Sequence, residues 1–327
     1  MFHLKELFSR DLFDYTLPLD NDLFFFGRQN LVAEHVDAVR RSENRGLFGL
    51  RKTGKTSVLF KLERTCRQAG LRCRYYDCKS PHIYRMSADD LLDQICADIS
   101  KMIETKVRGW QSKASASARF AALLEKIPET ERICLIFDEI EYISPRNPLG
   151  DHWKKEFVPF WQTIWSAQSQ HRKLSFVIAG VNAWVMEADS IDGIQNPLFG
   201  IIRANYLTGF DRQELFSLIH VFGKRMGLRF DEDAIDLLHD RYGGHPLLTR
   251  MICSQLNTSK RVAGLRRPID ILSADLKADV EAREAEIQFY CGHITSELES
   301  FYPGEYYMLE LLASKNIVDF VELAGRR

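Results

Sequence analysis

Five apolar runs recur along the chain up to residue 210, and amphipathic stretches separate them. The runs cover residues 45–49, 71–78, 132–139, 174–181 and 204–210. Between them, apolar residues recur three or four positions apart, which is the period of a helix that buries one face. Strands that alternate with helices form parallel sheets with helices on both faces. The pattern therefore predicts an α/β fold with a five-stranded parallel sheet.

After residue 210 the pattern is that of helices alone. Apolar residues recur at helical spacing over 215–222 and 234–238, and the second of these helices ends at Gly243-Gly244-His245-Pro246. Proline is favoured in the first turn of a helix, so the same four residues are expected to begin the next one. A linker is predicted over 258–272, and a long charged helix over 273–301 follows it.

These changes of pattern divide the chain into four parts. The end of the chain resembles the opening of a winged-helix domain, with a helix through Leu309 and a last helical stretch over 317–323. We predict an N-terminal docking segment, a P-loop-type α/β core, a helical lid and an incomplete winged-helix-like C-terminal region, over residues 1–23, 24–210, 211–259 and 260–327.

Composition and charge place the chain among ordinary globular proteins. Of its 327 residues, 45% are hydrophobic and 27% are charged, and the formal net charge is −1. This balance gives no overall attraction to nucleic acid or membranes, although basic residues gather at 260–267. The seven cysteines lack the spacing of a zinc site or a disulfide framework. With no apolar stretch of membrane-spanning length and no cleavable leader, we expect a cytoplasmic protein without a membrane partner.

The strongest motif directly follows the first predicted strand. It reads Gly-Leu-Arg-Lys-Thr-Gly-Lys-Thr over residues 49–56 and fits the phosphate-loop pattern G-x-x-x-x-G-K-[ST]. Glycines let backbone N–H groups turn toward phosphates, the lysine brings positive charge to the β- and γ-phosphates, and the last threonine offers a hydroxyl to Mg²⁺. A helix that begins at the loop adds its dipole to the anion site. The residues predicted to bind a nucleotide here are Gly49, Arg51, Lys52, Thr53, Gly54, Lys55, Thr56 and Ser57.

A second motif ends the third predicted strand. Residues 133–137 are apolar, and the carboxylates of Asp138 and Glu139 follow them. In a parallel sheet such residues lie at the carboxyl edge, beside the phosphate loop. Asp138 is expected to hold Mg²⁺ with Thr56, and Glu139 is expected to orient and deprotonate the attacking water. Glu139 therefore favours a site that hydrolyses its nucleotide over a purely structural nucleotide-binding scaffold.

Two further patterns allow a functional and a structural interpretation. Asn182 follows the fourth strand, where its side chain either senses the γ-phosphate and attacking water or simply ends the strand in a turn. Aromatic residues recur at helical spacing over 153–165. A base-stacking platform is conceivable there, but we expect a packing stripe, because helical spacing is the usual pattern of a buried face.

In their order along the chain, these motifs resemble a known family. A Phe-Gly-Arg box at 26–28 precedes the phosphate loop, and the Asp-Glu strand, Asn182 and the Gly-Gly-His-Pro turn follow it. This set resembles AAA+-type P-loop ATPases of the STAND division, close to the archaeal and bacterial ATPases related to origin-recognition ATPases. The resemblance spans about residues 24–260.

The resemblance implies roles for five further residues. Gly27 and Arg28 would lie beside the adenine and ribose, and His245 and Pro246 would close over the bound nucleotide. Arg203 would reach the γ-phosphate of a neighbouring subunit, as catalytic arginines do in AAA+ folds. Each position has a structural alternative: a strand–turn–helix lead-in for the first pair, helix–turn–helix punctuation for the second, and a surface arginine for Arg203.

The resemblance also implies a function. ATP or ADP, with Mg²⁺, would gate a slow switch that changes assembly state or partner, in bacterial signalling or anti-phage defence. The expected partners are copies of the same chain or a separate effector or regulator protein. The alternative is a DNA-associated ATPase that acts as a loader, a motor, or a regulator of transposition or replication. The basic residues at 260–267 favour this alternative, and the near-neutral net charge disfavours it.

Overall fold

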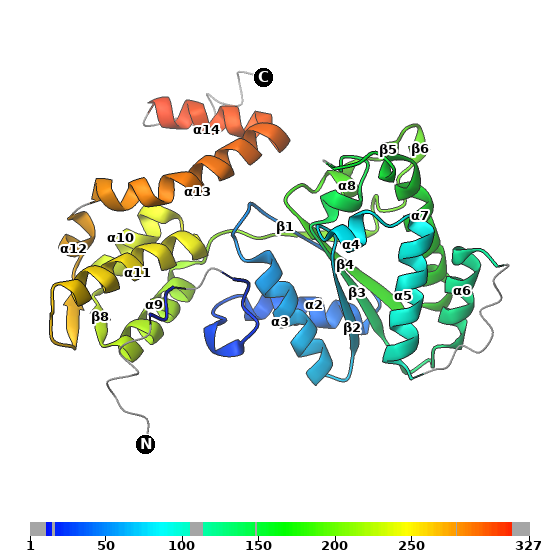
Figure 1. Ribbon diagram of the computed structural model, residues 1–327, viewed down its shortest axis with the longest axis horizontal. Coiled ribbons are helices and arrows are strands. Elements are labelled where there is room, and N and C mark those ends of the chain that lie inside the picture. The colour runs from blue at the N-terminus through cyan, green and yellow to red at the C-terminus, as the bar shows by residue number, and fades with distance from the viewer. Residues whose placement is uncertain (1–10, 15–16, 105–113, 148, 279, 316–327) are drawn as a thin grey trace. The chain divides into compact units, whose positions relative to one another are not determined.

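The computed structural model describes residues 11–14, 17–104, 114–147, 149–278 and 280–315. The chain divides into two compact units, which are described separately below. We call Leu17–Gly49 together with Gly54–Thr208 the sheet unit. The rest of the described chain, chiefly residues 209–315 with the loop tip Leu50–Thr53, is the helical unit (Figure 1).

The sheet unit is built on five parallel strands in the order β2-β3-β4-β1-β7. Their bounds are β1 Asn44–Phe48, β2 Arg72–Asp77, β3 Ile133–Asp138, β4 Leu174–Gly180 and β7 Ile202–Tyr206. β3 and β4 are buried along their whole length, as expected for central strands of a sheet covered on both faces. The α/β fold with a five-stranded parallel sheet is therefore confirmed.

Helices cover both faces of the sheet (Figure 1). α2 (Gln29–Arg40) and α3 (Lys55–Gln68) pack on one face, where Val36 and Leu59 belong to a common core with β1, β3 and β4. α5 (Ala88–Met102), α6 (Ala116–Lys126) and α7 (Trp153–His171) pack on the other face. The shorter elements of the unit are η1 Asp22–Phe24, α4 Pro81–Tyr84, η2 Ile140–Ile143, α8 Trp184–Glu187, β5 Ser190–Ile191 and β6 Ile194–Gln195.

The aromatic stripe of residues 153–165 lies on α7 and packs into the core. Trp153, Phe157 and Trp161 are completely buried, and Trp161 meets the ring of Phe176 on β4 with centroids 5.0 Å apart. Trp165 lies at the edge of the stripe and is 38% exposed. The interpretation as a packing stripe is confirmed.

The last strand of the sheet lies earlier in the chain than expected. The predicted strand covered 204–210, whereas β7 runs from Ile202 to Tyr206. Leu207 still donates its N–H to Phe48 O, but Phe210 then pairs its N–H with Gly244 O in the helical unit. Leu207 and Phe210 are therefore buried although neither belongs to the strand, and Leu207 packs in the core between the sheet and the helices α2 and α3. Strand periodicity alone does not separate such positions from strand positions.

The helical unit begins with three helices that the sequence predicts. Their bounds are α9 Arg212–Met226, α10 Glu232–Tyr242 and α11 Pro246–Val262. Asp211 and Glu214 form a capping box at the start of α9, which satisfies the first N–H groups of that helix. Gly243 ends α10 in a left-handed conformation, and His245 is the N-cap of α11. The sequence Gly243-Gly244-His245-Pro246 thus separates two helices as predicted.

The prediction of helices alone after residue 210 is wrong in one respect. β8 (Leu228–Phe230) and β9 (Ile269–Ile271) pair in parallel, and β9 lies inside the segment predicted as a linker. Strands of three residues are too short to show an alternating pattern, and the pairing joins two segments that lie far apart in the sequence. Their pairing is a tertiary feature that local periodicity does not contain.

The C-terminal part of the helical unit is helical, as expected. The predicted helix over 273–301 is two helices, α12 (Ser273–Lys277) and α13 (Val280–Phe301), and α14 (Pro303–Lys315) follows. The predicted stretch 317–323 lies outside the described residues, and the winged-helix likeness stays a prediction. Within the described residues, every helix is too short or too polar to cross a membrane.

A close backbone contact predicts unequal effects of alanine at two adjacent glycines. Both Gly243 and Gly244 have positive φ, but a Cβ on Gly244 would collide with the backbone of Phe210, whereas one on Gly243 would meet nothing within 4 Å. Gly243→Ala is expected to cost about 1 kcal/mol of unfolding free energy, and Gly244→Ala at least about 3 kcal/mol. Urea unfolding measures both. Equal stability of the two variants would contradict the contact.

Candidate functional site

The phosphate loop joins the end of β1 to the start of α3. Gly54 is the N-cap of α3 and has φ 95°, a conformation that favours glycine, and Lys52 in the loop has φ 63°. The side chain of Lys55 is buried at 5% exposure, and its Nζ donates to Gly49 O over 2.8 Å. The backbone N–H groups that begin α3 have no helical acceptor. The loop therefore combines a helix N-terminus with a lysine held inside the loop, which is an arrangement that binds phosphates.

Thr56 and Asp138 come together beside this loop. Thr56 Oγ1 donates to Asp138 Oδ2 over 2.7 Å, and Tyr75 on β2 donates its hydroxyl to the same oxygen over 2.9 Å. Asp138 is 1% exposed. Hydroxyl and carboxylate oxygens are the ligands that Mg²⁺ prefers, and Mg²⁺ bound to a nucleotide needs only one or two carboxylates. The pair Thr56–Asp138 thus fits the predicted metal site, although the described residues contain no cluster of three or more metal-ligating side chains.

Burial dominates the electrostatics of Asp138. It raises the pKa of the Asp138 carboxyl above its ordinary value, against the hydrogen bonds from Thr56 and Tyr75 and the charge of Lys55. A divalent cation beside Asp138 would favour the carboxylate form. The site is therefore short of positive charge for its buried acid, as a metal-binding carboxylate is expected to be.

Glu139 lies in a sharp turn after β3. Its backbone is left-handed, with φ 53°, and its N–H donates to Asp138 Oδ1 over 3.0 Å. The turn lets Asp138 stay in the sheet while the next residue leaves the strand direction. Among the described residues, no side chain forms a hydrogen bond or ion pair with the Glu139 carboxylate. A carboxylate without a competing partner is suited to accept a proton from water.

Asn182 lies just past β4 at the same edge of the sheet. Its Oδ1 accepts the N–H of Trp184 over 2.8 Å, so the side chain stabilises the turn that leads into the short helix α8 and keeps its Nδ2 group as the remaining donor. Its own N–H donates to Glu141 Oε1 over 2.8 Å, and Val181 N–H donates to the same oxygen. Asn182 thus has the structural role of ending the strand, and its role as a γ-phosphate sensor stays a prediction.

The Phe-Gly-Arg box reaches the phosphate loop. Gly27 and Arg28 both have left-handed backbones, and α2 begins directly after them. Arg28 Nη2 donates to Thr208 O over 2.8 Å, and Arg28 Nη1 lies 3.3 Å from the position that a Cβ on Gly54 would take. The structure thereby brings Arg28 beside the last glycine of the loop. Contact of Gly27 and Arg28 with adenine and ribose stays a prediction.

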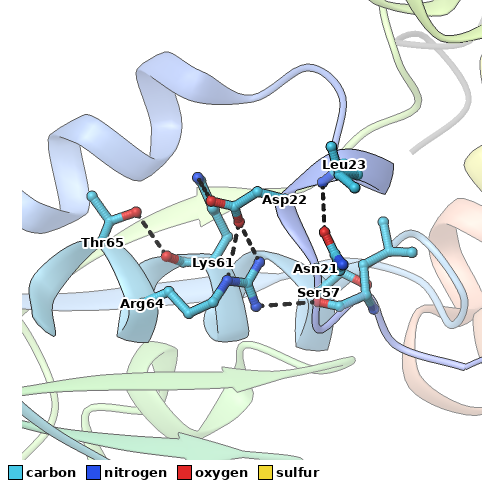
Figure 2. Close-up of polar contacts among 8 residues, drawn as sticks. Asn21, Asp22, Leu23, Ser57, Lys61, Arg64 and Thr65 are labelled. Carbon is cyan, nitrogen blue, oxygen red and sulfur yellow. Dashed lines mark hydrogen bonds and ion pairs between the residues drawn. The ribbon is translucent and has the colours of Figure 1, made fainter. Parts of the chain in front are cut away.

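The segment before the box lies along α3 (Figure 2). Asp22 forms ion pairs with Lys61 and Arg64, both at 2.8 Å, and Ser57 Oγ accepts the N–H of Leu19 over 3.0 Å. Ser57 thus contacts the N-terminal segment through its side chain. The docking prediction covers residues 1–23, of which 1–10 and 15–16 lie outside the described residues, so it stays a prediction for the whole segment.

Three predicted residues are not brought to the loop within the sheet unit. Arg203 is exposed on the edge strand β7, opposite Arg45 of β1, which is three positions before the strand end at Phe48. His245 and Pro246 lie in the helical unit at the start of α11, where His245 Nδ1 accepts the N–H of Leu248. A role for Arg203 in a neighbouring subunit, and nucleotide contact by His245 and Pro246, stay predictions.

Sequence reasoning missed two residues of the site, Tyr75 and Glu141. Tyr75 is on the same face of β2 as Asp77, whose register partner is Asp138, but that register is known only once β2 and β3 are paired. Glu141 lies in η2, two positions after Glu139, and its carboxyl contacts the backbone just past the end of β4. The only local signal for Glu141 was an acidic residue two positions after the Asp-Glu pair that ends an apolar strand.

Tyr75→Phe is expected to weaken the binding of Mg²⁺ at the site. The change removes one hydrogen bond to Asp138 and keeps the ring contact with Phe60, whose centroid lies 5.0 Å away. We expect the Mg²⁺ concentration for half-maximal hydrolysis to rise by about three- to tenfold. Tyr76→Phe is the matched control, because its hydroxyl bonds to Asp98 outside the site. Equal behaviour of the two variants would remove Tyr75 from the site.

The Glu141 carboxyl predicts a pH dependence of stability. Burial raises the pKa of Glu141 from 4.5 to about 7. The folded protein therefore binds this proton more tightly than the unfolded chain, so the contribution of Glu141 to stability falls as pH rises from about 4.5 to about 7 and stays low above that. Glu141→Gln should be more stable than the wild type at pH 8, by up to about 3 kcal/mol relative to their difference at pH 4.5. Urea unfolding at the two pH values measures this, and a pH-independent difference would contradict it.

Comparison with known proteins shows that part of the core is similar to AAA domains. A family model described as "AAA domain" matches residues 46–185, which include the phosphate loop, Asp138, Glu139 and Asn182. No curated protein matches the sequence. Among solved structures, a Walker-type ATPase of Pyrococcus abyssi superposes with a TM-score of 0.56 at 14% identity, over 96% of this chain and 91% of that chain. The ORC2 protein of Aeropyrum pernix, in ADPNP-ADP complexes, gives 0.51 at 15% identity, over 97% and 82%. At these identities the likeness is one of fold.

Proposed function

We propose that this chain binds ATP with Mg²⁺ and hydrolyses it slowly, and the match of residues 46–185 to a family model for AAA domains supports this proposal. The single observation that carries the proposal is the hydrogen bond of 2.7 Å between Thr56 of the phosphate loop and Asp138 at the end of β3. It joins the two sequence motifs into one site. The residue after Asp138 is Glu139, whose carboxylate has no partner among the described residues.

In this proposal each side chain has a distinct task. Backbone N–H groups of the loop and the start of α3 bind the phosphates, and Lys55 neutralises charge on the β- and γ-phosphates. Thr56 and Asp138 hold Mg²⁺, which supplies positive charge to the phosphate oxygens. Glu139 orients a water molecule and accepts its proton. The water oxygen bonds to the γ-phosphorus, the bond from that phosphorus to the ADP oxygen breaks, and ADP and phosphate leave.

We propose further that hydrolysis gates a molecular switch rather than a DNA motor. A nucleotide shifts an equilibrium only through contacts that differ between its two forms, and the γ-phosphate would supply such contacts to Lys55, Asn182 and Mg²⁺. Arg203, exposed on an edge strand, is available to a neighbouring copy or partner. Signalling or defence as the pathway rests on the resemblance alone, and the cytoplasmic location stays an expectation from the sequence.

The basic segment of 260–267 gives limited support to the DNA-associated alternative. Lys260 forms an ion pair with Asp275, and Arg267 donates to Met226 O and Asn257 Oδ1, so both side chains have partners within the helical unit. Arg261 and Arg266 are the exposed members of the cluster. Two exposed arginines on a chain of net charge −1 are a weak footprint for nucleic acid.

Light scattering with defined nucleotides tests the switch against the DNA-associated alternative. The mass of the wild-type chain is measured with Mg²⁺ and either ADP or a non-hydrolysable ATP analogue, each with and without duplex DNA at two salt concentrations. A mass or partner affinity that changes with nucleotide and not with DNA supports the switch. DNA binding that falls steeply with salt, with hydrolysis stimulated by DNA, would contradict it and support the alternative.

A further inference from the structure

A buried carboxyl links the ends of the two strands, β3 and β4, that carry the proposed hydrolytic residues. Glu141 Oε1 accepts the N–H of Asn182 over 2.8 Å and also the N–H of Val181. Glu141 Oε2 is buried and has no hydrogen-bond partner among the described residues. Glu141 itself belongs to the turn that begins at Glu139, whose carbonyl accepts the N–H of Tyr142 over 3.1 Å. One side chain thus connects the Glu139 turn to the backbone of Asn182.

We propose that Glu141 is a positioning residue for hydrolysis, which acts by fixing the backbone of Val181 and Asn182. This inference rests on the proposed ATPase function. The carboxyl orders the Asn182 backbone, and the N–H of Trp184 holds Asn182 Oδ1 at 2.8 Å. Together these two contacts set the direction of the Nδ2 group, which is the part of Asn182 left to contact the γ-phosphate or the attacking water. A displacement of 1 Å at such a group is enough to lower a rate strongly.

The end of β4 is shaped to admit this carboxyl. A Cβ on Gly180 would lie 2.7 Å from Glu141 Cδ and still closer to Oε1, which is nearer than side-chain atoms approach. Gly180 does not have a positive φ, so its backbone conformation does not require glycine. The requirement is steric: the carboxyl passes over the backbone at this residue. The position of the Glu141 carboxyl therefore depends on the missing side chain of Gly180, and each residue can be changed separately.

The geometry distinguishes a positioning role from a general contribution to folding. The acceptor oxygen of Glu141 is what the two N–H groups need, so the rate should follow the presence of that oxygen rather than the charge or volume of the side chain. Glu141→Gln keeps an oxygen at Oε1, whereas Glu141→Met keeps the length of the side chain and removes the acceptor. Glu125→Met, on the exposed side of α6, is the matched control for a glutamate-to-methionine change.

The test compares kcat for ATP hydrolysis with ATP affinity in these variants. Glu141→Met is expected to lower kcat at least about tenfold while the ATP dissociation constant changes by less than about twofold. Glu141→Gln should recover most of that loss, and Glu125→Met should match the wild type. Because Glu141 acts through Asn182, Glu141→Met should cost less than about twofold in an Asn182→Ala background. Full kcat in Glu141→Met, or losses that multiply in the double variant, would overturn the inference.

A second variant keeps the test decisive if Glu141→Met does not fold. Gly180→Ala places a methyl group against the Glu141 carboxyl and should lower kcat at least about fivefold without weakening ATP binding, with thermal unfolding as the check on folding. A folded Gly180→Ala variant with wild-type kcat would overturn the inference. Wild-type hydrolysis is measured first. Its absence would overturn the proposed function itself, whereas wild-type hydrolysis with unaffected variants would overturn the role of Glu141 alone.

Discussion

Glu139→Gln is expected to lower the rate of ATP hydrolysis at least about a hundredfold while ATP remains bound. The carboxylate of Glu139 has no partner among the described residues, and it follows the proposed Mg²⁺ ligand Asp138 at the end of β3. Glutamine keeps the size and polarity of the side chain but does not accept a proton from water. General-base catalysis contributes about 10²–10⁴-fold in enzymes, so the loss should be of that order.

Phosphate release at saturating ATP, together with the ATP dissociation constant, measures the effect of Glu139→Gln. Glu125→Gln on the exposed face of α6 is the matched control, because it makes the same chemical change away from the site. The free energy of unfolding should be unchanged, since the carboxylate forms no hydrogen bond or ion pair in the part of the chain that the structure describes. If Glu139→Gln hydrolyses ATP at the wild-type rate, Glu139 is not the base, and the scaffold interpretation of the site gains support.

Lys55→Met is expected to weaken ATP binding about ten- to a hundredfold. The Lys55 side chain is 5% exposed, and its Nζ lies 2.8 Å from Gly49 O at the beginning of the loop. Methionine preserves the volume of the side chain and removes the positive charge that the phosphates would meet. A charge-assisted contact in a buried site is worth about 1.5–3 kcal/mol, which corresponds to this loss of affinity.

Titration calorimetry with ATP and Mg²⁺ measures the effect of Lys55→Met. Lys101→Met is the control, because Lys101 is exposed on α5, away from the loop, and forms no described ion pair. The control should bind ATP as the wild type does. Wild-type affinity in Lys55→Met would show that the loop does not hold the nucleotide phosphates, and the function proposed for the site would have to be abandoned.

The elements that position the site could be predicted from sequence because their signals are local. The phosphate loop has fixed positions, β3 is an uninterrupted apolar run, and α3 has one apolar face. The same reasoning placed the start of the last strand two residues too late and its end four residues too late, because Leu207 and Phe210 are buried beyond the strand end and periodicity does not report what a residue packs against. β8 and β9 were missed because three residues carry no period.

Within the site, the sequence motifs indicated two residues that the structure brings together, but they did not indicate residues that reach the site from other strands or turns. Thr56 and Asp138 meet as expected, since the loop and the strand end lie at one edge of a parallel sheet. Tyr75 and Glu141 reach the site through strand register and through a turn of the chain, which a single sequence does not specify. Asn182 was identified by its place after a strand, but the hydrogen bond from the Trp184 N–H to its side chain depends on the local backbone geometry, which the sequence pattern does not specify.

Nucleotide content and turnover, measured on one preparation, test the central claim most directly. The wild-type chain is purified without added nucleotide, one part is denatured, and the released nucleotide is identified by chromatography. Phosphate release with Mg²⁺ and ATP is then followed on the rest. An ATP-hydrolysing switch predicts close to one ADP per chain and slow turnover that disappears in Glu139→Gln. A preparation that carries no nucleotide, binds no added ATP and releases no phosphate would contradict the assignment of this site.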